Sequence, residues 1–367
     1  MHSFKSLVLF ISVLQTLIFI LHWILYISLI GFFDIPEHSS WIGALLLILS
    51  ISFIATQILI QKRNLKILNV LYTLSCLWMG TLFFLLLGSL LTAIAVHIRI
   101  PELTNLPMFV IATMGFGIGI ICNLYAIQNG LRTRLKKVEV RVPGLPDIWY
   151  DKNIVFLADL HFGSVYGSTS AAELGSLVQS LTPDIVFVGG DFFDGPKAPY
   201  DELAQAFALK IHAKDGIYAV TGNHEEFTVA DEYTKPMEHT GIKVLNKESA
   251  IVDGVVVAGI GYLAGEDEKS FRSFVSTLPP HSILLKHSPS HAQILKEFDI
   301  SLMLCGHTHH GQVFPFTWLT DVIYKGFAYG LKKSGDTYVY TTTGARGWGP
   351  PHRWFTRPEI VLIKLVR

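Results

Sequence analysis

Five short segments of the sequence place aspartate, asparagine or histidine directly after a run of apolar residues. In the first, Asp159-Leu160-His161 follows Ile154–Ala158. Residues two apart on an extended chain point to the same side, so these two side chains can chelate one metal ion. After similar runs the other segments place Asp191, Asn223 and His224, His287, and His307 and His309. Because α/β sheets present ligands at the carboxyl ends of their strands, the pattern predicts a metal site at one sheet edge.

Asp191 is the carboxylate best placed to bridge two ions. It follows the apolar run Ile185–Val188 and the turn Gly189-Gly190, which together are typical of a buried strand. Each segment taken alone has a simpler interpretation, as a helix cap or a histidine packed in the core. Five such segments favour the metal site. We expect Asp194, three residues later, to contact a ligand residue or cap a helix and not to bind metal.

Four long apolar runs precede this region. The chain has 367 residues and a net charge of +0, and its mean hydropathy is +0.43. The runs cover Leu7–Phe33, Trp41–Ile60, Ile67–Val96 and Leu106–Ile127. Each meets the requirement of ~20 apolar residues for a bilayer span. A cleaved signal peptide has one shorter apolar run, so the pattern predicts four transmembrane helices.

The basic residues around these runs predict their orientation. Lys5 precedes the first run, and further basic residues follow the second and fourth runs: Lys62, Arg63 and Lys66, then Arg132, Arg134, Lys136 and Lys137. The loop after the first run holds Asp34 and Glu37 without lysine or arginine. By the positive-inside rule the N-terminus and everything after the fourth span are cytoplasmic. The sequence thus predicts an integral protein of the plasma membrane with four spans and a cytoplasmic catalytic domain.

Few residues inside the spans are polar. Gln15 and His22 lie on the first span, where ionisable residues are functional candidates, although a polar contact between helices is the simpler interpretation. Gly115 and Gly119 have a GxxxG spacing, which permits close helix packing and is weak evidence for a dimer. We expect residues 1–131 to be a membrane domain that serves as an anchor.

Residues 132–367 have the composition of a globular domain large enough for one sizeable core. Strands are expected at Val138–Val142, Ile154–Ala158, Ile185–Val188, Ile217–Val220, Ile251–Ala258, Ile283–Lys286, Ser301–Leu304, Thr337–Thr341 and Ile360–Lys364. Helical patterns cover Ala171–Leu181, Asp201–Ala213, Asp267–Leu278 and Ser290–Phe298. This order predicts an α/β domain with two packed sheets flanked by helices.

The ordered blocks resemble the signature of the calcineurin-like metallophosphoesterases. They are Asp159-Leu160-His161, Gly190–Asp194, Gly222–Glu225, His287 and Gly306–His309. The subgroup most similar to them is the membrane-attached bacterial phosphoesterases, which include a UDP-diacylglucosamine pyrophosphatase. The resemblance implies a four-layer sandwich of two mixed sheets flanked by helices. At His310 the chain departs from the subgroup, which usually has glycine there, and we expect this to alter the shape of the pocket.

The resemblance also implies a centre with two divalent metal ions. One ion is held by Asp159, His161, Asp191 and His309, and the other by Asp191, Asn223, His287 and His307. His224 then protonates the leaving oxygen or stabilises the transition state. Oxygen and nitrogen donors without thiolate suit manganese, iron, zinc or cobalt, of which we favour manganese. Two such ions can activate a water for in-line attack on phosphorus.

These features predict a membrane-anchored hydrolase of phosphodiester, phosphomonoester or pyrophosphate bonds, acting on a phosphorylated small molecule or lipid. Arg346 and Arg353 are either phosphate ligands or exposed surface residues. The aromatic residues of Gln312–Tyr329 form either part of the core or an apolar lip for a lipid. A nuclease is disfavoured because the net charge is +0. The alternative is a membrane scaffold or sensor with a catalytically weak domain, which the intact ligand set and His224 disfavour.

Overall fold

The computed structural model describes residues 4–36, 40–62, 65–98, 103, 105–195, 198–227 and 231–367. Glu37 and Arg63, which contribute to the predicted charge pattern of the loops, lie outside these residues. The chain divides into two compact units. One consists of Met1–Gln128 with Gly349–His352, and the other of Asn129–Trp348 with Arg353–Arg367.

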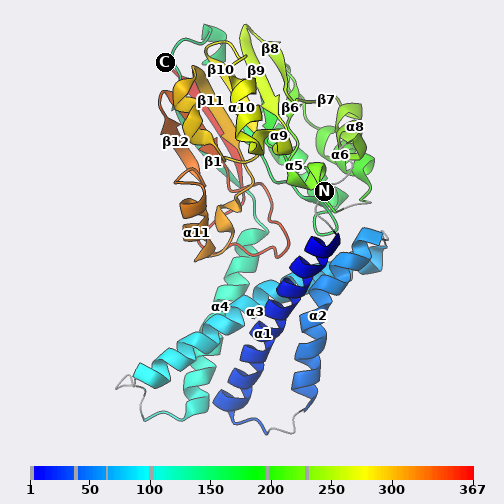
Figure 1. The fold of residues 1–367 in the computed structure, drawn as a ribbon, viewed down its shortest axis with the longest axis vertical. Coiled ribbons are helices and arrows are strands. Elements are labelled where there is room, and N and C mark those ends of the chain that lie inside the picture. The colour runs from blue at the N-terminus through cyan, green and yellow to red at the C-terminus, as the bar shows by residue number, and fades with distance from the viewer. Residues whose placement is uncertain are drawn as a thin grey trace. The chain divides into compact units, whose positions relative to one another are not determined.

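Four long helices make up most of the first unit (Figure 1). They are α1 (Phe4–Phe33), α2 (Ser40–Lys62), α3 (Lys66–Ile98) and α4 (Met108–Gly130). Each contains a segment that is long and apolar enough to cross a membrane. The four helices predicted from the apolar runs are therefore confirmed, with ends within a few residues of those expected.

The polar side chains of α1 make contacts with neighbouring helices. Gln15 Nε2 donates to the carbonyl of Ser50 at 3.0 Å, and Trp78 Nε1 donates to His22 Nε2 at 2.9 Å. The other ring nitrogen of His22 lies 2.8 Å from the carbonyl of Ile18. Both residues thus have the helix-to-helix polar contacts that were the simpler interpretation of their position.

The GxxxG glycines bring α4 close to α3 of the same chain. A Cβ on Gly115 would lie 2.8 Å from the carbonyl oxygen of Gly88, and one on Gly119 would lie 2.4 Å from that of Phe84. Only a residue without a side chain allows these backbones to approach so closely. The motif therefore packs two helices of one chain together and gives no support to a dimer.

The second unit contains two six-stranded sheets among the described residues. The first has the order β1 (Arg134–Arg141), β14 (Glu359–Val366), β2 (Ile154–Leu157), β4 (Ile185–Val188), β6 (Ile217–Ala219) and β7 (Ile242–Val244). It is mixed, because β14 runs antiparallel to β2 while the other pairs are parallel. The parallel strands β2, β4 and β6 end at one edge.

The second sheet is also mixed. Its order is β12 (Gly330–Ser334), β13 (Thr337–Thr341), β11 (Ile300–Cys305), β10 (Ser282–Lys286), β9 (Val255–Ile260) and β8 (Glu248–Val252). The two outer pairs are antiparallel, and the central strands are parallel. Two short strands, β3 (Phe162–Gly163) and β5 (Phe193–Asp194), pair separately beyond β2 and β4.

The two sheets pack face to face and are covered by helices on their outer faces. Phe156 and Phe187 of the first sheet meet Leu285 and Leu304 of the second in a common core. The outer layers are formed by α5 (Ser168–Gln179), α6 (Tyr200–Ala208) and α8 (Asp231–His239) on the first sheet, and by α10 (Glu268–Val275) and the 3₁₀ helix η2 (Ala292–Glu297) on the second. The predicted four-layer sandwich is confirmed. Burial on both faces explains why the central strands are continuous apolar runs.

Some elements differ from those expected. The predicted strand Ile251–Ala258 is the hairpin of β8 and β9, whose turn residues Asp253 and Gly254 have φ of 43° and 80°. The predicted helix Ser290–Phe298 is the shorter η2. The sequence did not predict β7, β12, α7 (Asn223–Glu226), α8, α9 (Tyr262–Glu266), α11 (Phe316–Ile323), or the 3₁₀ helices η1 (Asp147–Trp149) and η3 (His309–Gly311).

Candidate metal centre

The polar residues that follow the five apolar segments lie close together in the structure. β2 leads to Asp159 and His161, β4 to Asp191, and β6 to Asn223 and His224. The second sheet supplies His287 after β10, and His307 and His309 after β11. These side chains and Asp194 form three groups whose ligand atoms are close enough to hold a metal ion, and two of the groups share His161.

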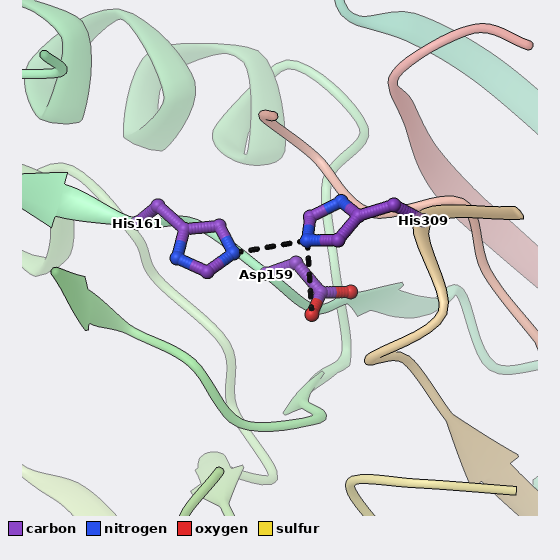
Figure 2. Close-up of side chains that lie close together, drawn as sticks. All are labelled: Asp159, His161 and His309. Carbon is purple, nitrogen blue, oxygen red and sulfur yellow. Dashed lines mark hydrogen bonds and ion pairs between the residues drawn. The ribbon is translucent and has the colours of Figure 1, made fainter. Parts of the chain in front are cut away.

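The first group consists of Asp159, His161 and His309. Figure 2 shows their side chains pointing toward one another, with His161 Nε2 3.1 Å from His309 Nε2 and His309 Nε2 3.9 Å from a carboxylate oxygen of Asp159. Asp191 adds an oxygen 3.9 Å from His161 Nε2. These are the four residues expected around one ion.

The second group consists of Asp191, His287 and His307. Nε2 of His287 lies 3.2 Å from an Asp191 oxygen and 3.2 Å from His307 Nδ1. The amide oxygen of Asn223 is 3.3 Å from the same nitrogen. These four residues are the set expected around the other ion, and Asp191 is the residue common to both sets.

His224 lies beside both sets and has its own partner. Its Nδ1 is 3.0 Å from an oxygen of Asp194, and its Nε2 is 4.0 Å from Asp191. The ring of Trp348 packs edge-on against it, with centroids 6.1 Å apart. Asp194 therefore contacts His224 and orients its imidazole. His161, Asp194 and His224 also form the third possible metal group, so the geometry allows His224 two different roles.

The charge states of two of these histidines suit metal binding, whereas for His287 burial lowers the pKa but Asp191 raises it by more, to about 9. Burial, followed by nearby His224, lowers the pKa of His161 to about 4, and burial, followed by nearby His287, lowers that of His307 to about 3. Both imidazoles are therefore neutral at pH 7, which is the form that binds metals. Nδ1 of His161 is buried and has no hydrogen-bond partner among the described residues. Facing imidazole nitrogens beside two buried carboxylates fit a first-row divalent ion.

Comparison with known proteins gives the family. Residues 152–311 match the model of the calcineurin-like phosphoesterases. These residues form a calcineurin-like phosphoesterase domain. An uncharacterized metallophosphoesterase of Campylobacter jejuni is 33% identical over 66% of this chain and 66% of its own length. A zebrafish (Danio rerio) transmembrane protein with a metallophosphoesterase domain is 31% identical over 66% of this chain and 60% of its own length.

A third relative is smaller. The phosphodiesterase YaeI of Escherichia coli is 27% identical over 58% of this chain and 82% of its own length. The chain thus spans about two thirds or less of the length of the first two relatives and most of the third. The relatives include a protein named for both a transmembrane part and a metallophosphoesterase domain.

The loops of the phosphoesterase domain adopt an uncommon backbone conformation at the site. Five of the proposed ligands have φ between 46° and 71°: Asp159, His161, Asp191, His307 and His309. Side chains disfavour this region, and such residues gather at functional sites where surrounding contacts hold them. Two glycines make room for the carboxylates, since a Cβ on Gly222 would lie 2.1 Å from Asp191 Oδ1 and one on Gly306 would lie 2.6 Å from Asp159 Oδ2.

Glu225 holds two loops of the domain together. Its buried carboxylate accepts hydrogen bonds from the backbone N–H groups of Asp191 and Phe193, both at 3.0 Å, and of Gly222 at 2.7 Å. It thereby fixes Asp191 relative to the segment that carries Asn223 and His224. This role of Glu225 was not predicted from the sequence. The signal was present, because a glutamate three residues after the residue that begins a helix is typical of a capping box.

Arg353 has neither of the two roles expected for it, which were a phosphate ligand and an exposed surface residue. It is fully buried, and its guanidinium donates to the carbonyls of His309, Thr343 and Arg346 at 2.6–2.8 Å. Nδ1 of His309 lies 3.0 Å from the same group. Arg346 is also buried and donates to Thr133 and Ser170. Both arginines therefore position loops, and Arg353 positions a proposed metal ligand.

We expect Arg353→Met to weaken metal binding. The substitution leaves the carbonyls of Thr343 and Arg346 without this donor, at a cost of about 1–3 kcal/mol each, and removes the group that fixes His309. The carbonyl of His309 keeps the N–H of Gln312 as a donor. Loss of such a partner typically lowers metal affinity by about 10–100-fold. Titration of the metal-free protein with Mn²⁺ measures the change. Arg357→Met, at an exposed arginine four residues later, is the control and should bind metal normally. Equal affinities for the two variants would show that Arg353 does not support the site.

Proposed function

We propose that this protein is a membrane-anchored phosphoesterase whose catalytic centre holds two divalent ions. Residues 1–131 form the membrane domain, and residues 132–367 form the catalytic domain. One ion is bound by Asp159, His161, Asp191 and His309, and the other by Asp191, Asn223, His287 and His307. The observation that carries the proposal is the position of Asp191 within reach of both histidine sets. Membership of the domain in a phosphoesterase family supports it.

Two bound ions would supply an activated water and neutralise charge on the phosphoryl group. His224 donates a proton to the leaving oxygen. Burial lowers the pKa of His224, but Asp191 and Asp194 together raise it to about 10, so the imidazole carries a proton at neutral pH. Its ring is partly exposed, whereas Asp194 behind it is held by the short β5 strand. A protonated, oriented and accessible imidazole is the arrangement that a general acid requires.

The substrate we propose is a phosphodiester, phosphomonoester or pyrophosphate, with a lipid-linked phosphate as the preferred class. The transmembrane relative from zebrafish and the four span-capable helices support a substrate found at a membrane. The name of the E. coli relative supports a phosphodiester. Manganese is the metal we favour, since the donors are carboxylate oxygens, an amide oxygen and imidazoles.

Chelation should abolish hydrolysis, and Mn²⁺ should restore it. The purified full chain would be treated with EDTA, dialysed and assayed with nitrophenyl phosphomonoesters, nitrophenyl phosphodiesters and lipid pyrophosphates before and after metal addition. The expected result is a loss with every substrate and a recovery with at least one. Hydrolysis that survives complete removal of metal would contradict the mechanism. A metal-loaded protein that hydrolyses none of the substrates would favour the scaffold or sensor alternative.

We further propose that the protein lies in the plasma membrane with its catalytic domain in the cytoplasm. The charge pattern of the loops supports this orientation. A cysteine in place of Ser39, in the first predicted external loop, should react with an impermeant thiol reagent added to intact cells, whereas one in place of Ser168 should not. Labelling at position 168 in intact cells would reverse the proposed orientation.

A further inference from the structure

Helix α11 (Phe316–Ile323), labelled in Figure 1, has an exposed apolar face that no role in the metal centre explains. Trp318, Leu319, Val322 and Ile323 are all exposed, with Trp318 at 67%, while Thr317 is buried. Their spacing places the four side chains on one side of the helix. The preceding Phe314 and Phe316 are exposed as well. The interpretation of this segment as core aromatics is therefore wrong for its first half.

Both ends of α11 contact the loop that carries two of the proposed metal ligands. A Cβ on Gly311 would lie 2.3 Å from the backbone of Phe316, so the start of the helix rests on the residues after His309. Tyr324, which follows the helix, packs its ring edge-on against His307 at a centroid distance of 6.2 Å. A molecule or surface that covered the apolar face would therefore lie next to the metal centre.

A cavity of about 290 Å³ beside this face is lined by exposed cationic residues. Arg134, Lys136 and Arg357 line it, and none of the ion pairs formed by the described residues involves them. The carboxylate that also lines the cavity, Glu359, accepts hydrogen bonds from the hydroxyls of Tyr329, Tyr340 and Thr342. The three cations thus have no carboxylate partner among the described residues, and the guanidinium of Arg134 donates only to the neutral amide oxygen of Asn129, at 3.3 Å.

The cavity and the apolar face form one continuous surface. Phe355 lines the cavity, is 73% exposed, and packs against Phe314 with ring centroids 5.8 Å apart. His310 also lines it and lies 3.3 Å from Asp321 of α11. His310, the residue that departs from the phosphoesterase subgroup, therefore joins the helix to the cavity. Exposed aromatic and aliphatic side chains beside unpaired cations are typical of surfaces that bind the interface of an anionic bilayer.

The length of the chain keeps this surface within reach of a membrane. α4, the last span-capable helix, ends at Gly130, and β1 begins at Arg134. Four residue steps extend at most ~14 Å, so Arg134 stays near the end of that helix. The end of a membrane-spanning helix lies at the depth of the lipid phosphates, so the short connection to α4 keeps Arg134 near them. A binding site for a soluble partner would not need this short connection. These observations select a lipid bilayer as the occupant of the surface.

We propose that the apolar face of α11, with Phe314 and Phe355, docks into the interface of an anionic bilayer, while Arg134, Lys136 and Arg357 bind lipid phosphates. Docking places the entrance of the metal centre at the level of the headgroups. The further step, that the substrate is a membrane lipid, rests on the proposed function. The docking itself does not depend on the proposed function.

Photocrosslinking of the full chain in nanodiscs tests the docking. p-Benzoylphenylalanine replaces Trp318 or, as the control, Ile251, which is 77% exposed on β8. The discs contain either phosphatidylcholine alone or a mixture with phosphatidylglycerol, and adducts are identified by mass spectrometry. Position 318 should give several-fold more lipid adduct than position 251, and more in the anionic discs. Arg134→Gln, Lys136→Gln and Arg357→Gln, combined, should remove the preference for anionic discs.

Equal lipid adduct at the two positions would overturn the proposal, as would an adduct at position 318 that joins two copies of the chain. Persistence of the anionic preference in the triple variant would overturn the assignment of the three cations. Hydrolysis of a soluble nitrophenyl phosphodiester is measured in the same discs. Lipid adduct at position 318 without hydrolysis would support docking and count against the phosphoesterase activity, so the two proposals fail separately.

Discussion

Asp191→Ala is expected to reduce metal content and hydrolysis more than the loss of any single histidine. Asp191 lies within reach of both proposed metal sets, at 3.2 Å from His287 and 3.9 Å from His161. Asp159, of the first set, approaches His287 less closely, at 4.0 Å. Removal of Asp191 also takes the nearest counter-charge from the buried His287 and leaves only the more distant Asp159. The fall in kcat should exceed the ~10²–10⁴-fold typical of losing a general acid, because both ions are affected. Metal content would be measured by elemental analysis together with single-turnover rates.

Asp194→Ala is the matched control for that experiment. Asp194 is a half-buried carboxylate three residues away that contacts His224, and it is not a ligand in the proposed centre. The control should retain both ions and lose part of its activity. A metal content near two per chain in the Asp191→Ala protein would contradict the bridging role. Loss of metal in the Asp194→Ala protein would instead favour the third group, in which Asp194 and His224 are ligands.

His224→Ala should keep both ions and lower kcat by on the order of 10²–10⁴-fold. In the proposed centre His224 donates a proton to the leaving oxygen. The loss should therefore be smaller for a nitrophenolate leaving group, which needs little protonation, than for an alkoxide. His287→Ala and His309→Ala should lose metal and activity together, with partial recovery in excess metal. Metal analysis and single-turnover rates with two leaving groups distinguish the variants.

The outcome that would contradict the general-acid role is specific. A His224→Ala protein that had lost metal would make His224 a ligand of the third group. Equal rate losses for the two leaving groups would leave His224 a role in binding the phosphoryl group but not in proton transfer. The second outcome would leave the ligand sets around Asp191 as proposed. The first would not, because the third group shares His161 with the first set.

The fold followed from patterns that are local in the sequence. The apolar runs of α1–α4 and of the buried strands β2 and β4 are long or uniform enough to identify without tertiary information. β7 and β12 were missed because each has few apolar residues and lies at a sheet edge. The strand expected at Ile251–Ala258 was wrong because Asp253-Gly254 is a turn inside an otherwise apolar stretch.

The candidate site was predictable where residue type alone carries the chemistry. Aspartate and histidine residues that follow strands indicate a metal site by their types alone. The sheet topology then brings these residues together at one edge. The roles of Arg353 and Glu225 were not predicted, because each depends on carbonyl or N–H groups from distant parts of the chain. The left-handed backbone conformation of His161 and His309 could not be predicted either, since histidine has no strong preference for that conformation.

The most direct test of the two-ion centre is an anomalous-difference map from crystals of the Mn²⁺-loaded protein. The account predicts two peaks ~3.5–4 Å apart, as in other two-metal hydrolytic centres. One peak should lie between His161 and His309, the other between His287 and His307, and Asp191 should contact both. A single peak, or a peak coordinated by His224 and Asp194, would contradict the proposed centre.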